Sequence, residues 1–592
     1  MTEHPEKSKL EEGWRRHRAG DRAGAEILYR EVVAANPQNF EALWRLAFLL
    51  GQKREFQESE RLLERAAQLR PTADALFLRA YALQMLQRYE DALACLDRAL
   101  ELNREMKEAI LNRASVLFTL RRYQDAAADY ERLLELDPLS PFARGNRLFC
   151  QAHCCDWRQL SQERELVITE LHQGKPVVAP FDGKALGLVP ADELSCARIW
   201  VANQCPASTP LWNGECYAHD RIRVAYISAN FQGHAVAHVF ARVLENHDAG
   251  RFETFAISLG PDDKSALRAR IAGSCAHFID AQAKGDVDIA RFIRDNEIDI
   301  AVDLMGFTEG CRPGIFAHRP APIAVNYLGF PGTMGAEYID YIIADRIVVP
   351  RTNEGDYAEK IVFLPDAYLP GNLPVQPAER ARSRKDAGLP ADGFVFCSFN
   401  APYKITPEMF SVWMRLLAAV KRSVLWLGQG NPHAIENLKR AAEERGIGSE
   451  RLVFAPYLPT AEDHLARLKL AELFVDTSPY NAHVTALDAL SVGVPVLSLA
   501  GHSFAGRVAA SVLQALDLPE LIAPSLVAYE TLALRLARDP AALAEIRAKL
   551  ARNLQGSGVF DTQRYTRNLE KAFIGMWERG RSGELAKGFE VA

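Results

Sequence analysis

The chain has 592 residues, of which 25% are charged and 48% are apolar, values that are ordinary for a globular protein. Its net charge of −6 gives no general attraction to nucleic acid or to an anionic membrane, so we expect neither as a partner. We find no secretory signal, no run of membrane-spanning length and no CxxC pair among the ten cysteines. These features predict a cytoplasmic protein with reduced thiols and several domains.

The first 150 residues contain a repeat. A spacing of 33 or 34 residues separates the positions that end a helix-like stretch in each unit, Pro37, Pro71, Arg104 and Pro138. Small residues come twelve positions earlier in every unit, at Ala25, Ser59, Ala92 and Ala126. Two helices in about 34 residues are typical of tetratricopeptide repeats, although a plain helical bundle is an alternative. We predict an α-solenoid over 1–150 whose concave face binds acceptor proteins or peptides.

The remainder of the chain predicts an α/β architecture. Residues 151–217 have the pattern of a helical and irregular linker region. Beyond it, β-type runs alternate with helix-like segments, first at 223–228, 252–258, 298–304, 323–330, 341–345 and 360–365. After a Pro-rich passage at 369–380 they resume at 394–400, 423–429, 451–457, 473–477 and 494–499. This alternation predicts two Rossmann-like lobes, one at 218–375 and one at 376–592 that ends in helices, with a ligand site between them.

One segment, Asn481 to Asp488, carries the clearest chemical signal. It follows one β-type run and precedes another, so a helix is expected to begin near His483. A helix start offers free backbone N–H groups, and His483 and Thr485 add polar side chains that suit a phosphate. Asp488 follows Thr485 by about one turn, where a carboxylate can reach ribose hydroxyls. The segment predicts a nucleotide-linked ligand.

Loops at other strand ends complete this predicted site. Lys404 follows the run at 394–400 and supplies a compact positive charge for a diphosphate. His234 follows the run at 223–228, and the glycines of 328–335 allow close approach of backbone to a ligand. His234 and His238 could hold zinc, but no further ligand follows at metalloenzyme spacing. With no DxD after a strand, the pattern favours a metal-independent nucleotide-sugar transferase.

Several long motifs resemble one family. They are GHAVAH (233–238), RPAPIAVNYLGFPGTMG (319–335), FCSFNAPYKITP (396–407), SVLWLG (423–428) and DTSPYNAHVTALDAL (476–490). Together with the repeats they resemble the protein O-GlcNAc transferase family, including its bacterial members. The resemblance implies a GT-B enzyme that transfers GlcNAc from UDP-GlcNAc to Ser or Thr hydroxyls of proteins, with inversion and without a cofactor.

The same resemblance implies roles for individual residues. His234 is similar to the family's active-site histidine, and Lys404 to the lysine that binds the pyrophosphate and stabilises departing UDP. His483 and Thr485 resemble the phosphate-contacting helix start, and Asp488 the ribose-binding carboxylate. The other predicted nucleotide-sugar contacts are Gly329, Pro331, Thr333, Asn400, His464 (near the uracil) and Val484.

Some positions depart from the family pattern. Ala401 stands where animal members carry a glutamine, and Val484 replaces the first of two threonines after the histidine. The family's peptide-holding asparagine ladder is short. Asn112 and Asn146 fit its 34-residue spacing, but Trp44 and Leu78 occupy the two preceding positions. These departures leave alternatives open: another donor such as UDP-glucose or GDP-fucose, an asparagine acceptor, or a repeat scaffold that binds nucleotide without turnover.

Overall fold

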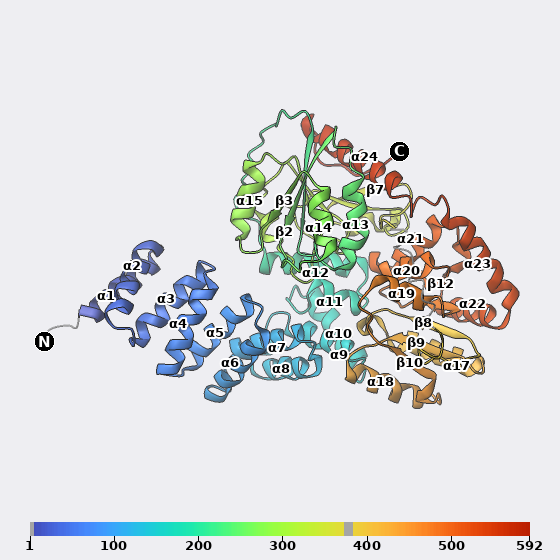
Figure 1. Cartoon of the computed structure of the whole chain (residues 1–592), viewed down its shortest axis with the longest axis horizontal. Helices are drawn as coiled ribbons and strands as arrows, with labels where there is room; N and C mark the ends of the chain where they lie inside the picture. The colour runs from blue at the N-terminus through green and yellow to red at the C-terminus, as the bar shows by residue number, and fades with distance from the viewer. Residues whose placement is uncertain (1–4, 372–382) are drawn as a thin grey trace. The chain divides into compact units, whose positions relative to one another are not determined.

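A computed structural model describes residues 5–371 and 383–592 of the protein (Figure 1). The chain divides into two compact units, residues 1–151 and 152–592. The lobe boundary predicted at 375/376 lies outside the described residues. Across the described ranges, no helix combines the length and apolar character needed to cross a membrane.

The first unit consists of antiparallel helix pairs. Its helices are α1 (Pro5–Arg18), α2 (Arg22–Ala35), α3 (Phe40–Gln52), α4 (Phe56–Leu69), α5 (Ala73–Met85), α6 (Tyr89–Leu102), α7 (Lys107–Thr119), α8 (Tyr123–Leu136) and α9 (Ala143–His153). The small repeat residues Ala25, Ser59, Ala92 and Ala126 are all buried. A larger side chain there would hold the paired helices apart, so these positions set the repeat geometry. The predicted helical repeats are confirmed.

The N-terminal lobe of the second unit holds an eight-stranded parallel sheet in the order β14-β7-β6-β5-β4-β1-β2-β3. Its strands are β1 (Ile222–Ser228), β2 (Phe252–Ser258), β3 (His277–Asp280), β4 (Ile300–Asp303), β5 (Ile323–Asn326), β6 (Tyr341–Ala344), β7 (Lys360–Phe363) and β14 (Phe589–Glu590). The chain reverses its direction of winding between β1 and β4. At such a switch point the strand-end loops diverge and leave room for a ligand.

The C-terminal lobe repeats this design with six parallel strands in the order β10-β9-β8-β11-β12-β13. They are β8 (Val395–Ser398), β9 (Val424–Gly428), β10 (Leu452–Ala455), β11 (Leu473–Val475), β12 (Val496–Leu499) and β13 (Ile522–Ala523). Here the switch point lies between β8 and β11. The two doubly wound lobes predicted from the sequence are confirmed.

Helices flank both sheets and fill the segment predicted as a linker (Figure 1). That segment contains α10 (Leu160–His172), α11 (Pro180–Ala185) and α12 (Pro190–Gln204). The N-terminal lobe contributes α13 (Ala235–Glu245), α14 (Ala266–Ser274), α15 (Asp286–Asp295) and α16 (Gly314–Ala317). The helices that follow β8 are α17 (Pro407–Ala419), α18 (Pro432–Glu443), α19 (Ala461–Leu468), α20 (Val484–Ser491), α21 (Val508–Ala515), α22 (Leu526–Arg538), α23 (Pro540–Leu554) and α24 (Thr562–Arg581).

The end of the chain differs from the predicted C-terminal lobe. From α24 onward it packs on the N-terminal lobe instead. Trp577 donates a hydrogen bond from Nε1 to Asp299 Oδ1 over 3.2 Å, and the ring of Phe573 lies 6.2 Å from that of Tyr226. Strand β14 then pairs with β7 and covers the edge of the sheet. The assignment of all residues from 376 to 592 to one lobe is therefore corrected.

This packing predicts a large stability effect from a residue of α24. Phe573 is fully buried, so Phe573→Ala removes a large apolar side chain and leaves a cavity. We expect the free energy of unfolding of the second unit to fall by ~3–5 kcal/mol, measured by guanidinium denaturation. Arg567→Ala, at an exposed position of the same helix, is the control and should change it little. Equal effects of the two substitutions would contradict the packing of α24.

Candidate functional site

A buried carboxylate organises the strand-end loops of the C-terminal lobe. Asp476 directly follows β11 and is fully buried. Its Oδ1 accepts hydrogen bonds from the backbone N–H groups of Thr477 (2.7 Å) and Ala482 (2.6 Å), and its Oδ2 accepts one from Ser498 Oγ (2.6 Å). Asn400 Nδ2, in the loop after neighbouring β8, donates to Oδ1 over 3.0 Å. The carboxylate thus joins both loops of the switch point.

Asn400 links that carboxylate to the start of α20. Its Nδ2 also donates to Thr477 Oγ1 over 2.8 Å, and its Oδ1 accepts from Thr485 Oγ1 over 2.8 Å. Because both ends of the amide are engaged by protein, Asn400 positions the helix start. Because the Thr485 hydroxyl donates its proton to Asn400, the Thr485 oxygen can take part in further hydrogen bonds only as an acceptor.

The start of α20 presents backbone donors. His483 is its N-cap residue but makes no side-chain cap hydrogen bond. The N–H groups of Val484 and Thr485 lie in the first turn, where an α-helix provides them with no acceptor. His483 Nε2 donates instead to the carbonyl of Ala505 over 3.2 Å. Burial, aided by the charge of Lys404, lowers the pKa of His483 well below its usual range. Such a helix start suits an anion, and here an imidazole held in its neutral form lies beside it.

Lys404 is the positive charge beside this helix start. Its Nζ donates to the carbonyl of Asn481 over 2.9 Å and lies 3.9 Å from the ring centroid of Tyr480. Burial lowers the pKa of Lys404 to about 7, although the carboxylate of Asp476 opposes that shift. An anion bound nearby would raise the pKa again by stabilising the ammonium. Lys404, Tyr480, Asn481 and His483 are thus brought together.

Asp488 and His464 form a second, adjacent pair. Their Oδ2 and Nε2 atoms are 4.0 Å apart. Arg467 donates from Nη2 to His464 Nδ1 over 2.9 Å, which leaves the proton of a neutral ring on Nε2. Burial raises the pKa of Asp488 to about 7 and, together with Arg467, lowers that of His464 to about 4. The edge of His464 meets the ring of Phe399 at 5.5 Å, so polar groups and an aromatic surface lie side by side.

His234 belongs to the N-terminal lobe and is exposed. It caps α13, where its Nδ1 accepts a hydrogen bond from the N–H of Val236 over 3.2 Å. Desolvation, with a smaller contribution from His238, lowers its pKa, which favours the neutral ring. Since Nδ1 is an acceptor, the ring proton lies on Nε2. The free nitrogen of His234 is therefore a donor.

The glycine loop at 328–335 is shaped by close packing. A Cβ on Gly329 would lie 2.0 Å from the carbonyl oxygen of Leu304, so only glycine fits there. Pro331 and Thr333 are buried, and Thr333 Oγ1 donates to the buried Glu359 over 2.6 Å. The structure therefore uses Thr333 to hold the loop, and it does not bring its hydroxyl to the other predicted site residues.

Sequence reasoning missed α11, which lies in the segment predicted as a linker. The ring of Phe181 lies 6.2 Å from that of Tyr480, and Lys184 Nζ lies 4.9 Å from the ring centroid of Phe330. Lys184 is buried in an ion pair with Glu193, and its charge helps to lower the pKa of His483. Helix α11 therefore connects the glycine loop of the N-terminal lobe with the Tyr480 loop of the C-terminal lobe. No spacing or motif marks it in the sequence.

No group of three or more His, Cys, Asp or Glu residues within 5–371 and 383–592 is arranged to hold a metal ion. The groups brought together are instead the Lys404 amine and the backbone N–H groups at the start of α20. The pair of Asp488 and His464 flanks them.

Two Rossmann-like lobes and a helical repeat unit define a GT-B glycosyltransferase architecture joined to tetratricopeptide repeats. The model of the glycosyl transferase family 41 matches residues 194–375 and 371–569, and a tetratricopeptide repeat model matches 10–74 and 77–141. The chain belongs to glycosyl transferase family 41. This confirms the resemblance drawn from the motifs.

Relatives agree with this assignment. A probable UDP-N-acetylglucosamine–peptide N-acetylglucosaminyltransferase (SEC) of Arabidopsis thaliana is 33% identical over 70% of this chain and 44% of its own length. The UDP-N-acetylglucosamine–peptide N-acetylglucosaminyltransferase of Caenorhabditis elegans is 26% identical over 72% of this chain and 48% of its own. This chain therefore spans about half the length of those relatives. A solved structure of a mutant of Thermobaculum terrenum O-GlcNAc transferase covers 98% of both chains, with 27% identity and a TM-score of 0.62.

Proposed function

We propose that this chain transfers GlcNAc from UDP-GlcNAc to serine or threonine hydroxyls of proteins, with inversion and without a metal ion. The observation that carries the proposal is Lys404, an enclosed ammonium beside the uncapped start of α20 in a family 41 lobe. The names of the relatives and of the solved neighbour support the donor and the acceptor class.

The departing UDP sets the main chemical demand. Negative charge develops on the β-phosphate as the sugar leaves, and preorganised donors at that position lower the barrier by several kcal/mol, about 3–4 for one donor. Lys404 and the N–H groups of Val484 and Thr485 would supply such donors without a metal ion. Asp488 would accept hydrogen bonds from ribose hydroxyls, and His464 with Phe399 would face the base.

His234 is proposed to orient the reactants. Its Nδ1 is engaged by the N–H of Val236, so removing a proton from the acceptor hydroxyl would require loss of the α13 cap. The Nε2–H can instead donate to an acceptor oxygen or a donor phosphate. Gly329 and Pro331 would shape the sugar-facing side of the site. Val484 lacks a hydroxyl, so it contributes only its backbone.

The direct test is incubation with UDP-GlcNAc and a cell lysate, followed by site-mapping mass spectrometry. We expect HexNAc on serine or threonine, undiminished by EDTA, and a β-linked product by NMR. UDP-glucose and GDP-fucose are the donor controls. Transfer only from another donor, or only to asparagine, would contradict the proposed donor or acceptor. UDP binding without turnover would indicate a nucleotide-binding scaffold.

Lys404→Ala should be the most damaging alanine substitution for kcat. It removes the ammonium that stabilises departing UDP, and we expect kcat to fall ~10²–10³-fold. Lys421→Ala, at an exposed lysine of the same lobe, is the matched control. His234→Ala should lower kcat less and leave the shape of the pH–rate profile unchanged. A larger loss of kcat in His234→Ala than in Lys404→Ala would refute this ranking.

UDP binding should be coupled to protonation of Lys404. Without UDP the pKa of Lys404 is about 7, and a bound diphosphate would raise it. The contribution of the Lys404 ammonium to UDP binding is therefore complete below about pH 7 and is lost as the pH rises through the pKa of the UDP-bound state. We expect proton uptake when UDP binds at about pH 8. Isothermal titration calorimetry in buffers of different ionisation enthalpy measures it. Lys404→Met should abolish the uptake at that pH, and an apparent enthalpy independent of buffer would contradict the coupling.

A further inference from the structure

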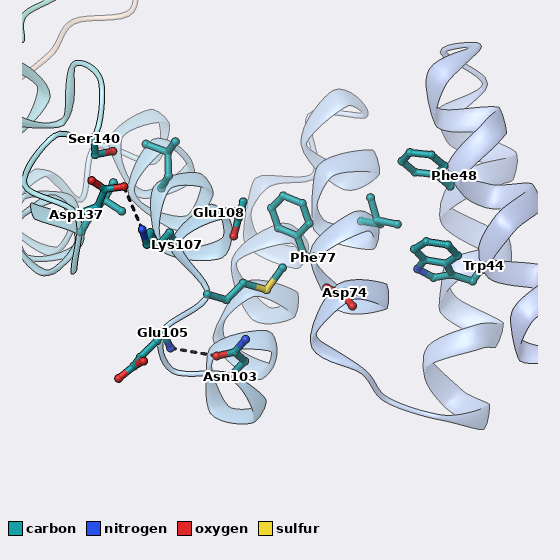
Figure 2. Close-up of a pocket in the computed structure, with 14 residues that line it drawn as sticks. Trp44, Phe48, Asp74, Phe77, Asn103, Glu105, Lys107, Glu108, Asp137 and Ser140 are labelled. Carbon is teal, nitrogen blue, oxygen red and sulfur yellow. Dashed lines mark hydrogen bonds and ion pairs between the residues drawn. The ribbon is translucent and has the colours of Figure 1, made fainter. Parts of the chain in front are cut away.

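The ammonium groups of this protein are stabilised in different ways. Lys107 of the repeat unit, which lines a groove with aromatic side chains, pairs with the carboxylate of Asp137 at 3.1 Å (Figure 2). Lys404 forms no ion pair with any described residue. Its Nζ donates to the carbonyl of Asn481 over 2.9 Å and lies 3.9 Å from the ring centroid of Tyr480. Because the face of an aromatic ring carries partial negative charge, Tyr480 takes the place that a carboxylate has at Lys107.

The ring of Tyr480 is enclosed by other rings. Phe181 of α11 and Tyr403, in the loop after β8, meet it edge-on with centroids 6.2 and 6.0 Å away. His483, at the start of α20, lies 5.1 Å away at a tilted angle. Only 5% of Tyr480 is exposed. Since three elements pack around the ring, it has little freedom to turn away from the ammonium.

The ring and the carbonyl together restrict the directions in which Lys404 can donate. An ammonium has three N–H donors at the end of a flexible four-carbon stem. The carbonyl of Asn481 takes one of them, and the face of Tyr480 occupies a second side of the nitrogen. The remaining donor capacity is directed away from both groups. Without the ring, the stem would be held by a single hydrogen bond.

We propose that Tyr480 is a positioning residue for Lys404: its ring face holds the ammonium beside the start of α20 in the orientation that meets a diphosphate. Only the step in which this ammonium stabilises departing UDP rests on the proposed function. The contact between ring and ammonium is a property of the protein without a ligand. It requires an aromatic ring at position 480 and does not use the hydroxyl, which forms no hydrogen bond with a described residue.

Charged and titratable groups reach Lys404 from each neighbouring element. Burial lowers the pKa of Lys404, and the carboxylate of Asp476, after β11, opposes that shift. His483 is held in its neutral form at the start of α20. Lys184 of α11, whose charge acts on His483, is paired with Glu193 of α12. A ring face favours the ammonium as Asp476 does, so loss of the ring should lower the pKa of Lys404 further.

The test measures the pKa of Lys404 in the full chain without a ligand. Trace acetylation by acetic anhydride modifies only the neutral amine, and mass spectrometry of the peptide that contains Lys404 gives the rate at each pH. Accessibility changes this rate at every pH but leaves its midpoint in place. In Tyr480→Leu we expect the pKa of Lys404 to fall by about one pH unit. Tyr480→Phe keeps the ring and should leave the pKa unchanged.

Two further measurements separate the charge of the ring from its packing. Phe410→Leu removes a similarly buried ring, one that faces Trp157 and Arg445, and should leave the pKa of Lys404 unchanged. Phenylalanine with one, two or three ring fluorine atoms, incorporated in place of Tyr480, keeps the shape of the ring and weakens its negative face. The pKa of Lys404 should then fall stepwise with each fluorine, a trend that loss of folding cannot produce.

Under the proposed transfer the same variants should change turnover. We expect Tyr480→Leu to lower kcat about tenfold with a smaller change in KM, because the ammonium is displaced from the departing phosphate. Activity is lost as the pH rises through the pKa of Lys404, so a lower pKa should move the alkaline limb of the pH–rate profile to lower pH. Tyr480→Phe should retain both the rate and the profile.

The outcomes separate this proposal from the proposed function. An unchanged pKa of Lys404 in Tyr480→Leu would overturn the positioning role, as would the absence of a trend with fluorination or an equal fall of the pKa in Phe410→Leu. A fall of the pKa in Tyr480→Leu, in a protein that transfers no sugar from any donor, would support the positioning role and count against the transferase activity. Transfer of GlcNAc with a lysine pKa that does not depend on the ring would do the reverse.

Discussion

The hydrogen bonds to the buried carboxylate of Asp476 hold the C-terminal lobe's site in place. An ionised carboxylate without water is costly unless donors surround it. Here the donors are two backbone N–H groups, the Ser498 hydroxyl and the Asn400 amide. Because two of them are at Thr477 and Ala482, the loop between these residues closes around the carboxylate. That closure places the Asn481 carbonyl against Lys404 and fixes where α20 begins.

Burial moves the titratable groups around this carboxylate toward their neutral forms. It lowers the pKa of Lys404 and His483 and raises the pKa of Asp476 and Asp488. The site therefore carries less charge than its residue types suggest. A diphosphate would reverse the shift at Lys404, since a nearby anion stabilises the ammonium. Under the proposed function the diphosphate would supply the charge that completes the site, and proton uptake would accompany its binding.

The sequence predicts those parts of the structure that depend on local pattern. The strands before Asn400 and Asp476 follow from short apolar runs, and the start of α20 follows from the polar residues between two such runs. Partners distant along the chain escape this reasoning. Thr333 is directed at Glu359 by a buried hydrogen bond, Lys184 lies in a short helix without a motif, and β14 is a two-residue strand whose partner is β7. Tertiary contacts determine these features, and local propensity does not encode them.

The two units place different demands on a protein substrate. Under the proposed transfer, the chemistry beside Lys404 requires only a hydroxyl near the donor, so the C-terminal lobe would give little reason to discriminate among serine- or threonine-containing segments. The repeat unit would discriminate among such segments. Trp44 and Leu78 occupy positions where asparagine amides could hold the backbone of any peptide. Discrimination among partners would then reside in the solenoid, where substitutions change which segments bind while the barrier to departure of UDP stays the same.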